Sequence, residues 1–269
     1  MNQAFVYNSY DFIGFELCNG LLEEGWIVFG HSGDLLTHEK EWGEEKRLLI
    51  GRNGNFHEVK DTPPKIEGPY TLFIPLYDLY IKEETFVESV LSNHPLYSNN
   101  PPSTIVLIIP KTMVHVWDKD EKIFNQSYKQ HQIQTIKFWA PTVYGRWQPH
   151  PFLFAQSHYV KDENDLKNVV DDVTDAIYVK DFVSSMIETI QSTKTGEFLM
   201  KSNQDQEWER VAQLFMSKEK MKHFIHTNEI SCHPFEHSIT VEPSKKINEI
   251  MDEYKRTNAY ESLIKNEKH

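Results

Sequence analysis

Five histidine and cysteine side chains fall close together near the end of this 269-residue sequence: His223, His226, Cys232, His233 and His237. Imidazole and thiolate groups are the usual ligands of zinc in proteins. Their spacing matches no standard zinc finger, however, and the segment contributes a single cysteine. We therefore interpret the segment as a histidine-rich polar loop and expect no metal site.

Motifs for nucleophilic catalysis or phosphate binding are not found. The sequence contains no Gly-x-Ser-x-Gly elbow and no Walker loop. Ser32 lies between Gly30 and Gly33, but this short segment is typical of a loop that follows a strand. The sequence therefore does not support a serine hydrolase or a nucleoside triphosphatase.

Aromatic side chains surround Pro149 and Pro151 and form a second candidate region. They are Trp139, Tyr144, Trp147, Phe152 and Phe154. Such a cluster could stack on a flat or sugar ligand, or it could fill space as a hydrophobic plug. We favour the plug, because most large aromatic side chains in proteins are at least partly buried.

Composition narrows the class of protein. Acidic residues outnumber basic ones by 40 to 28, the formal net charge is -12, and no basic stripe is present. Nucleic-acid and anionic-membrane binding depend on clustered Lys and Arg, so we expect neither partner. The two cysteines, Cys18 and Cys232, suit a reducing compartment. With no secretion signal and no membrane-length apolar run, we expect a cytoplasmic protein.

Hydrophobic patterning predicts a parallel α/β sheet. A strand at 4–8, a helix at 12–24 and a strand at 26–29 open the chain, which is the usual start of a doubly wound fold. The run at 103–109 is apolar throughout, as in a strand buried on both faces. Further strands are expected at 48–50, 56–59, 70–76, 135–139, 175–179 and 196–201, and helices at 84–91, 181–192, 206–216 and 244–255.

Two domains are expected from this order of elements. Residues 1–145 would form a Rossmann-like domain with a degenerate dinucleotide fold. Residues 146–269 would form a smaller α/β lobe of the substrate-binding type, interleaved with the first domain.

Four segments carry a resemblance to a known family. Ala4–Gly14 resembles the opening strand and glycine-rich turn of the extended short-chain dehydrogenases/reductases, the NAD-dependent epimerases and dehydratases. Pro141–Gly145 resembles their Pro-x-Val-Tyr-Gly signature, and Asp175–Val183 and Gly196–Ser202 resemble two later segments in the same order. The resemblance implies a Rossmann-like sheet, an NAD or NADP cofactor and a nucleotide-sugar substrate.

The glycine-rich turn departs from the pattern of that family. The fingerprint needs three glycines, but its positions fall on Asn8, Asp11 and Gly14. Asn8 can adopt a left-handed turn. Asp11 adds an anion where the pyrophosphate would lie, or it caps the following helix and occupies the same amides. Gly14 would then remain for the packing of helix against strand. The ribose-binding acid aligns with Ser32, and Asp34 close by is a second candidate for it.

The catalytic positions depart further. The family uses a Tyr with a Lys four residues later, and none of the 12 tyrosines has such a Lys. Tyr128 is the nearest candidate, Thr112 aligns with the catalytic Ser/Thr, and Tyr77 would crowd the cofactor. The helix between the fifth and sixth strands looks shortened. By resemblance, Tyr144, Arg146 and Trp147 would border the substrate cleft.

These departures favour a non-catalytic relative that acts as a binding or regulatory protein and carries no cofactor. The alternative is an active enzyme that binds NAD or NADP and uses replaced residues, with Thr112, Tyr128 and Arg146 as candidates. The partner would be a small molecule or a protein. The family forms dimers through a helix pair, so the resemblance leaves a homodimer open.

Overall fold

The computed structural model describes most of the chain. The described residues are 1–32, 40–60, 66–82, 90, 100–128, 133–159, 166, 169–193, 195–227, 235 and 237–253. The helix expected at 84–91 lies almost entirely outside them, as do Cys232 and His233 of the histidine-rich segment.

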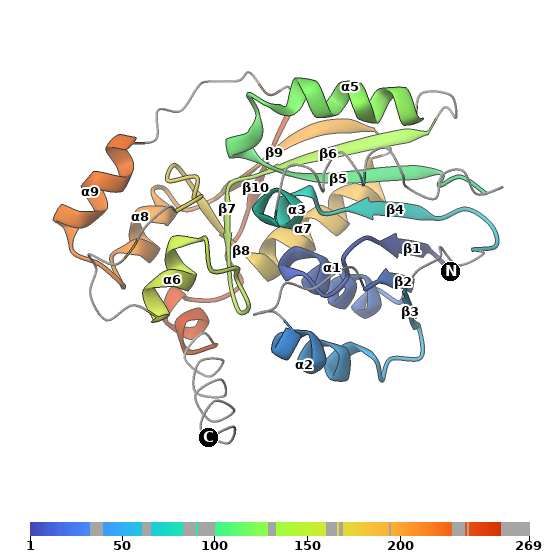
Figure 1. Cartoon of the computed structure of the whole chain (residues 1–269), viewed down its shortest axis with the longest axis horizontal. Coiled ribbons are helices and arrows are strands. Elements are labelled where there is room, and N and C mark those ends of the chain that lie inside the picture. Colours follow the sequence, from blue (N-terminus) through green and yellow to red (C-terminus); the bar gives the residue numbers. More distant parts are fainter. Residues whose placement is uncertain are drawn as a thin grey trace. The chain divides into compact units, whose positions relative to one another are not determined.

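An eight-stranded, mostly parallel sheet organises the fold (Figure 1). Its order is β10-β9-β6-β5-β4-β1-β2-β3. The strands are β1 (Gln3–Val6), β2 (Ile27–His31), β3 (Phe56–Val59), β4 (Thr71–Ile74), β5 (Thr104–Pro110), β6 (Gln134–Ala140), β9 (Gly196–Ser202) and β10 (His237–Val241). Two further strands, β7 (Thr142–Tyr144) and β8 (Ala176–Tyr178), pair in parallel as a separate small sheet.

The direction of winding reverses at β1. Val6 of β1 is in register with Gly30 of β2 on one side and with Phe73 of β4 on the other. From β1 the chain moves outward to β2 and β3, then returns to β4 and continues to β5 and β6. This is the predicted doubly wound parallel sheet, which is confirmed. Ligands of such sheets bind beyond the carboxyl ends of the strands at the reversal.

Helices connect these strands. They are α1 (Phe12–Glu23), α2 (Lys40–Ile50), α3 (Leu76–Lys82), α5 (Trp117–Tyr128), α6 (Leu153–Tyr159), α7 (Val179–Ser192), α8 (Glu207–Ala212) and α9 (Lys218–Thr227). Gly20 of α1 lies against Val183 and Ile187 of α7, so these two helices pack together. Gly25 ends α1 with a φ of 75°, as expected for a glycine at a helix end.

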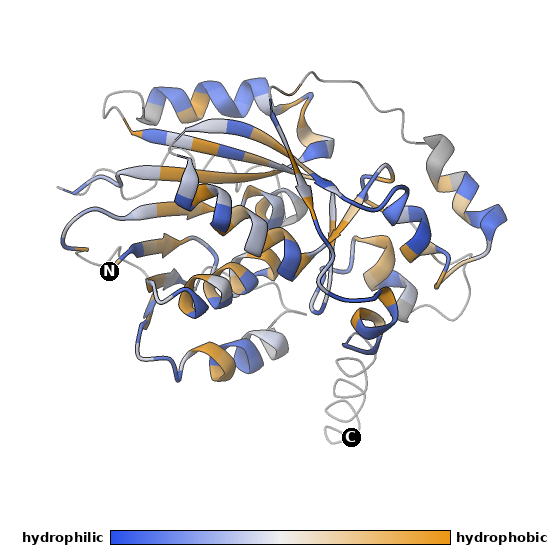
Figure 2. Ribbon diagram, turned by 180° about the vertical axis from the view of Figure 1, so that it is seen from behind, coloured by the Kyte–Doolittle hydropathy of each residue, from blue (hydrophilic) through white to orange (hydrophobic). Residues whose placement is uncertain are grey.

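The core on one face of the sheet joins β4, β5 and β6 to α3 and α5. Ile105, Leu107 and Ile109 of β5 contribute to it together with Trp117 and Phe124 of α5. The intervening β5 residues are also fully buried, so the prediction of a strand covered on both faces is confirmed. Figure 2 colours the chain by hydropathy: orange, hydrophobic segments lie along strands of the sheet, and the helices carry both orange and blue residues.

The short strand expected at 48–50 is wrong, because these residues form the last turn of α2. Leu48 and Leu49 are 66% and 54% exposed, whereas Ile50 is buried. Lys46, four residues before Ile50, is buried as well, which is the spacing of one helix face. The apolar triplet therefore follows helical rather than strand periodicity.

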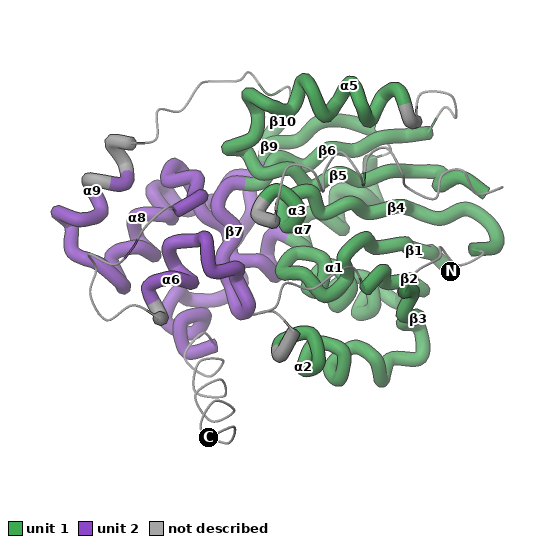
Figure 3. Tube along the Cα trace, in the orientation of Figure 1, with its two compact units in different colours: residues 1–140, 183–199, 235–239 green, residues 141–182, 200–234, 240–269 purple. Residues whose placement is uncertain are grey.

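The chain divides into two compact units (Figure 3). Unit 1 contains residues 1–140, 183–199 and 235–239, and unit 2 contains 141–182, 200–234 and 240–269. The first unit holds most of the large sheet, and the second holds β7, β8, α6, α8 and α9. Of the helix expected at 244–255, residues 247–253 are described as helical.

Candidate functional site

The turn after β1 crosses the carboxyl ends of three strands. Asn8 has a φ of 49°, so the predicted left-handed turn is confirmed. The Tyr7 amide donates to the Phe73 carbonyl at 3.0 Å, and the Ser9 amide donates to the His31 carbonyl at 2.7 Å. The turn is thereby fixed to β4 on one side and to β2 on the other.

Gly14 allows α1 to approach this turn closely. A Cβ atom at position 14 would lie 2.2 Å from the carbonyl oxygen of Asn8. Atoms cannot approach so closely without movement of the backbone, so no other residue fits here without strain. The packing role expected for this glycine is therefore what the geometry requires.

A carboxylate of the chain itself occupies the amino end of α1. Asp78, in the first turn of α3, accepts hydrogen bonds from the Ile13 amide at 2.9 and 3.1 Å and from the Gly14 amide at 3.0 Å. Asp78 is only 2% exposed. The first amides of a helix and its dipole favour an anion at this end, and dinucleotide-binding folds place pyrophosphate there. Here Asp78 supplies the anion.

Asp11 does not fill the role expected of it. It stands at the N-cap of α1, but its side chain makes no capping hydrogen bond, so the predicted alternative of capping is wrong. Asp78 takes the amides instead. Sequence reasoning missed this contact because 65 residues separate Asp78 from Ile13. The available signal was an acidic residue directly after β4, at the edge of the sheet where α1 begins.

Side chains of the turn and of α2 fill the neighbouring space beside β2. Tyr10 is almost fully buried, packs against Phe56 at 6.3 Å between ring centroids, and lies under the Arg47 guanidinium at 4.9 Å. Lys46 is also buried, and its Nζ donates to the carbonyls of Tyr10 at 2.8 Å and Asp11 at 3.3 Å. Burial raises the pKa of Tyr10 to about 12, so the phenol stays neutral.

The structure says less about the other residues that were predicted to contact a cofactor. The Ser32 amide donates to the Val59 carbonyl at 2.9 Å, which ties the end of β2 to β3. Asp34, the other candidate for a ribose-binding acid, lies outside the described residues. Tyr77 is buried beside Asp78 in the first turn of α3. Its expected conflict with a cofactor stays a prediction.

The vestigial catalytic positions lie in and beside the helix between β5 and β6. Thr112 is exposed in a short 3-10 turn, Lys111–Met113, that follows β5. Tyr128 is the last residue of α5, a helix of 12 residues, and its side chain is outside the described part. A catalytic arrangement of these two residues therefore stays a prediction, since the Tyr128 side chain is not among the described ones.

Trp139 of β6, a member of the predicted aromatic cluster, belongs to a packed network. Its Nε1 donates to Glu197 at 2.6 Å, and its ring meets Trp117 edge-on at 6.1 Å. Lys137 pairs with Glu121 and lies 3.7 Å from Glu197. These contacts fasten α5 to β6 and β9, which is a structural role.

In unit 2, Tyr144 belongs to a buried aromatic cluster. Its ring meets Phe154 edge-on at 5.9 Å, and Phe154 in turn packs against Trp208 at 6.0 Å. The Tyr144 hydroxyl donates to Glu207 at 3.1 Å. The cluster therefore forms part of the hydrophobic core of this unit.

Arg146 and Trp147 form a tight turn directly after Tyr144. The Arg146 guanidinium lies 4.0 Å from the centre of the Trp147 ring, and Trp147 has a φ of 64°. At Gly145, whose φ is 156°, an added Cβ would lie 2.6 Å from Val179. None of the three residues predicted for the substrate cleft lines the pocket described next.

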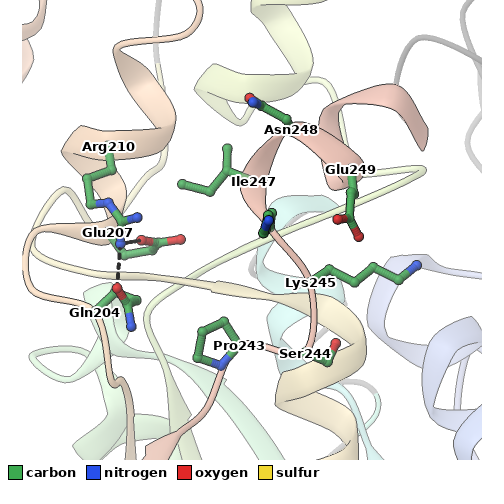
Figure 4. Close-up of a pocket in the computed structure, with 10 residues that line it drawn as sticks. Gln204, Glu207, Arg210, Pro243, Ser244, Lys245, Ile247, Asn248 and Glu249 are labelled. Atoms are coloured by element: carbon green, nitrogen blue, oxygen red, sulfur yellow. Dashed lines mark hydrogen bonds and ion pairs between the residues drawn. The ribbon is translucent and has the colours of Figure 1, made fainter.

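A pocket of about 540 Å³ lies within unit 2 (Figure 4). Gln204, Glu207 and Arg210, on α8 and just before it, form one wall, and residues 243–249 form the other. Arg210 is held in place because its Nη1 donates to Gln204 at 2.8 Å and to Glu207 at 2.9 Å. The sequence signals for this site were the Glu207/Arg210 pair, one helical turn apart, and consecutive lysines at 245 and 246.

Hydrogen-bond donors dominate the groups that this pocket leaves unengaged. Among the described residues, the Nη2 and Nε of Arg210, the Lys246 ammonium, the Ser244 hydroxyl and the Gln204 amide nitrogen have no partner, whereas Glu249 is the one carboxylate in the same condition. Lys245 is already paired with Glu253. An excess of free donors, two of them cationic, suits a ligand rich in acceptor oxygens.

Two buried carboxyl groups lie beside this wall. Burial raises the pKa of Glu207, against the opposing effects of Arg210 and Tyr144. Burial also raises the pKa of Asp171 to about 6, although the Leu153 amide and the Trp208 indole both donate to it. Glu207 lies on α8, and Asp171 contacts α8 through the Trp208 indole.

Searches against family models and curated proteins found no match. Solved structures do match over nearly their whole length. Vestitone reductase from alfalfa (Medicago sativa) is 13% identical with a TM-score of 0.61, and 97% of this chain covers 99% of that one. UDP-glucuronic acid 4-epimerase from Bacillus cereus, in complex with NAD, is 12% identical with a TM-score of 0.63 and coverages of 95% and 99%.

A dehydratase structure matches the chain to a similar extent. dTDP-glucose 4,6-dehydratase from Bacillus anthracis, in complex with NAD, is 13% identical with a TM-score of 0.59 and coverages of 97% of both chains. The chain therefore has the fold of the NAD-dependent epimerases, dehydratases and reductases, and the fold that the sequence resemblance implied is confirmed.

The structure bears on metal ligands and on membrane-spanning helices only through its described residues. Within the described residues no group of His, Cys, Asp and Glu side chains is arranged to hold a metal, but much of the histidine-rich segment lies outside them. No helix in the described part of the chain is long and apolar enough to cross a membrane.

Proposed function

We propose that this protein is a non-catalytic relative of the sugar-nucleotide epimerases and dehydratases that acts as a small-molecule binding or regulatory protein. The observation that carries the proposal is the Asp78 carboxylate on the Ile13 and Gly14 amides. In the wild-type chain those amides are already satisfied by an anion, so a dinucleotide would have to displace a buried, charge-assisted contact.

The energetic cost of such a displacement supports the proposal. Two negative charges about 4 Å apart repel by roughly 4 kcal/mol at an effective dielectric of about 20. If Asp78 moved away instead, the repulsion would be relieved but its hydrogen bonds to the two amides, which contribute about 1.5–3 kcal/mol each, would break. Tyr10 and Lys46, packed beside the turn, would have to move as well.

The pocket of unit 2 is the proposed binding site. The remaining donors of the Arg210 guanidinium, beyond those bound by Gln204 and Glu207, and the Lys246 ammonium favour a small ligand that carries carboxylate or phosphate oxygens. A volume of about 540 Å³ is in the ordinary range for small-molecule sites. A ligand could bind in this pocket without a cofactor and without any contact to the turn after β1.

The test is a titration of NAD, NADH, NADP and NADPH followed by calorimetry and thermal unfolding. The B. cereus epimerase, whose structure contains NAD, is the positive control. We expect no saturable heat for Arg210→Met, in which the phosphate-binding donors of the unit 2 pocket are weakened, and none for the wild-type protein beyond what this variant abolishes. A ligand present at 100 times its dissociation constant stabilises a protein by about 2.7 kcal/mol, so a clear rise in the Tm of Arg210→Met with any dinucleotide would contradict the proposal.

The alternative is an active enzyme on the same fold. It is favoured by the NAD seen in several structures of this fold, and it would use Thr112, Tyr128 and Arg146. Dinucleotide binding in the same titration, followed by turnover of a nucleotide sugar, would establish it.

A further inference from the structure

Helix α8 is anchored by polar side chains on two consecutive residues. Glu207 accepts from the Tyr144 hydroxyl at 3.1 Å, and the Trp208 Nε1 donates to Asp171 Oδ1 at 3.0 Å. Trp208 is fully buried and Asp171 nearly so. Buried polar contacts of this kind fix the position of an element, because leaving either partner unsatisfied is costly.

Apolar burial also holds α8, because Trp208, Val211 and Ala212 are fully buried, whereas its backbone contributes little. The helix has six residues, too few to be stable without tertiary contacts. Gln206, at its N-cap, has a φ of 55° and makes no side-chain capping bond. A non-glycine residue in this left-handed region costs roughly 1–2 kcal/mol. The placement of α8 therefore depends strongly on its side-chain anchors.

Asp171 accepts hydrogen bonds but is offered no acceptor. Its Oδ2 takes the Leu153 amide, at the start of α6, at 2.8 Å, and its Oδ1 takes the Trp208 indole. When the carboxyl is ionised, both donors are satisfied. When it is protonated, the hydrogen bonds lose their charge assistance and one oxygen becomes a hydroxyl, which is a poorer acceptor, so the hold on the Leu153 amide and the Trp208 indole weakens.

The charged surroundings of Asp171 are simple. Asp172, next in the chain, disfavours ionisation. On α8 the titratable or charged groups are Glu207, Glu209 and Arg210, and residues 153–157 of α6 carry none. His150, before α6, is exposed. Burial is the largest effect and raises the pKa of Asp171 to about 6.

We propose that Asp171 is a proton-sensitive anchor of α8, and that its protonation releases Trp208 and shifts Glu207 and Arg210 in the pocket wall. The coupling follows from the geometry, since Glu207, Trp208 and Arg210 lie on one short helix. It goes beyond the proposed function and depends neither on the occupant of the pocket nor on the state of the turn after β1.

The experiment follows the indole N–H of Trp208 and the guanidinium Nε–H of Arg210 by nuclear magnetic resonance from pH 4.5 to 8. We expect both signals to shift with a common midpoint near pH 6. Asp171→Asn should abolish that transition in both signals. Glu207→Gln removes the other raised carboxyl, and the Trp208 transition should persist in it.

Three outcomes would overturn the proposal: a Trp208 signal that is constant with pH, a transition that survives Asp171→Asn, or an Arg210 signal that does not share the midpoint. Should Asp171→Asn fail to fold, Trp208→Phe decides the matter. It removes the hydrogen bond that links Asp171 to α8, so the transition at Arg210 should be lost while the Tm still reports a folded protein. A transition near pH 6 that persists at Arg210 in that variant would contradict the proposal equally.

Discussion

The turn after β1 and the pocket of unit 2 are both polar sites beside a helix, and they differ in what the chain leaves free. At the turn, the Ile13 and Gly14 amides are already bound by Asp78. In the pocket, Arg210 is fixed through one nitrogen while its other donors have no partner among the described residues. A satisfied anion site stabilises a fold, whereas unengaged donors on a fixed side chain are what a ligand needs.

Removing the resident anion should have the largest effect on stability. Asp78→Ala leaves two buried amides without an acceptor, at about 1–3 kcal/mol each, so we expect a loss of about 4 kcal/mol in urea unfolding. Asp118→Ala is the matched control, because Asp118 also lies in the first turn of a helix but is exposed. Sulfate should restore part of the stability of Asp78→Ala and none of Asp118→Ala. Equal losses of stability in the two variants would show that Asp78 has no special role.

The close approach at Gly14 should rank second. Gly14→Ala places a Cβ atom 2.2 Å from the Asn8 carbonyl, and overpacking of this kind costs about 3 kcal/mol. Gly54→Ala is the control, since nothing lies within 4 Å of an added Cβ there. Thermal unfolding of the two variants gives the comparison, and a Gly14→Ala protein as stable as wild type would mean that the turn is not packed as described.

Asp171 should make stability depend on pH. Its pKa rises from 3.8 to about 6 on folding, so the native state keeps the proton longer than the unfolded state. The stabilisation is complete below pH 3.8 and is lost as the pH rises through about 6. About two pKa units at 1.36 kcal/mol each amount to between about 2 and 3 kcal/mol. The difference in the free energy of unfolding between wild type and Asp171→Asn should therefore change by about that amount between pH 3.8 and about 6. A difference that stays constant over this range would contradict the prediction.

Parts of both sites could be predicted from the sequence. The left-handed Asn8 and the packing glycine at 14 follow from local rules, because a turn between a strand and a helix restricts its own residues. Asp78 could not be found in this way, since only the folded sheet brings the start of α3 to the start of α1. The pocket likewise joins residues 204–210 to 243–249, which no local pattern connects. Tyr144 was predicted near a ligand; it does not line the pocket, but its hydroxyl donates to Glu207 in the pocket wall.

The smallest stability effect should come from the pocket. Arg210→Met removes an ion pair between the half-exposed Arg210 and the buried Glu207, which keeps its hydrogen bond from Tyr144, so we expect a loss of about 1–2 kcal/mol. Lys246→Met should be close to neutral in chemical denaturation. Both variants should weaken the binding of small carboxylates or phosphates if the donors serve a ligand. A loss of stability as large as that of Asp78→Ala would make Arg210 structural and erase the contrast between the two regions.

The most direct test of the closed turn is to follow the backbone amide signals of Ile13 and Gly14 by nuclear magnetic resonance while NAD is added to the wild-type protein and to Asp78→Ala. The wild-type signals should stay constant at millimolar NAD, because Asp78 holds both amides. In Asp78→Ala the freed amides should shift on addition of NAD or pyrophosphate. Saturable shifts of these two amides in the wild-type protein would contradict the account, since they would show that a dinucleotide displaces the carboxylate.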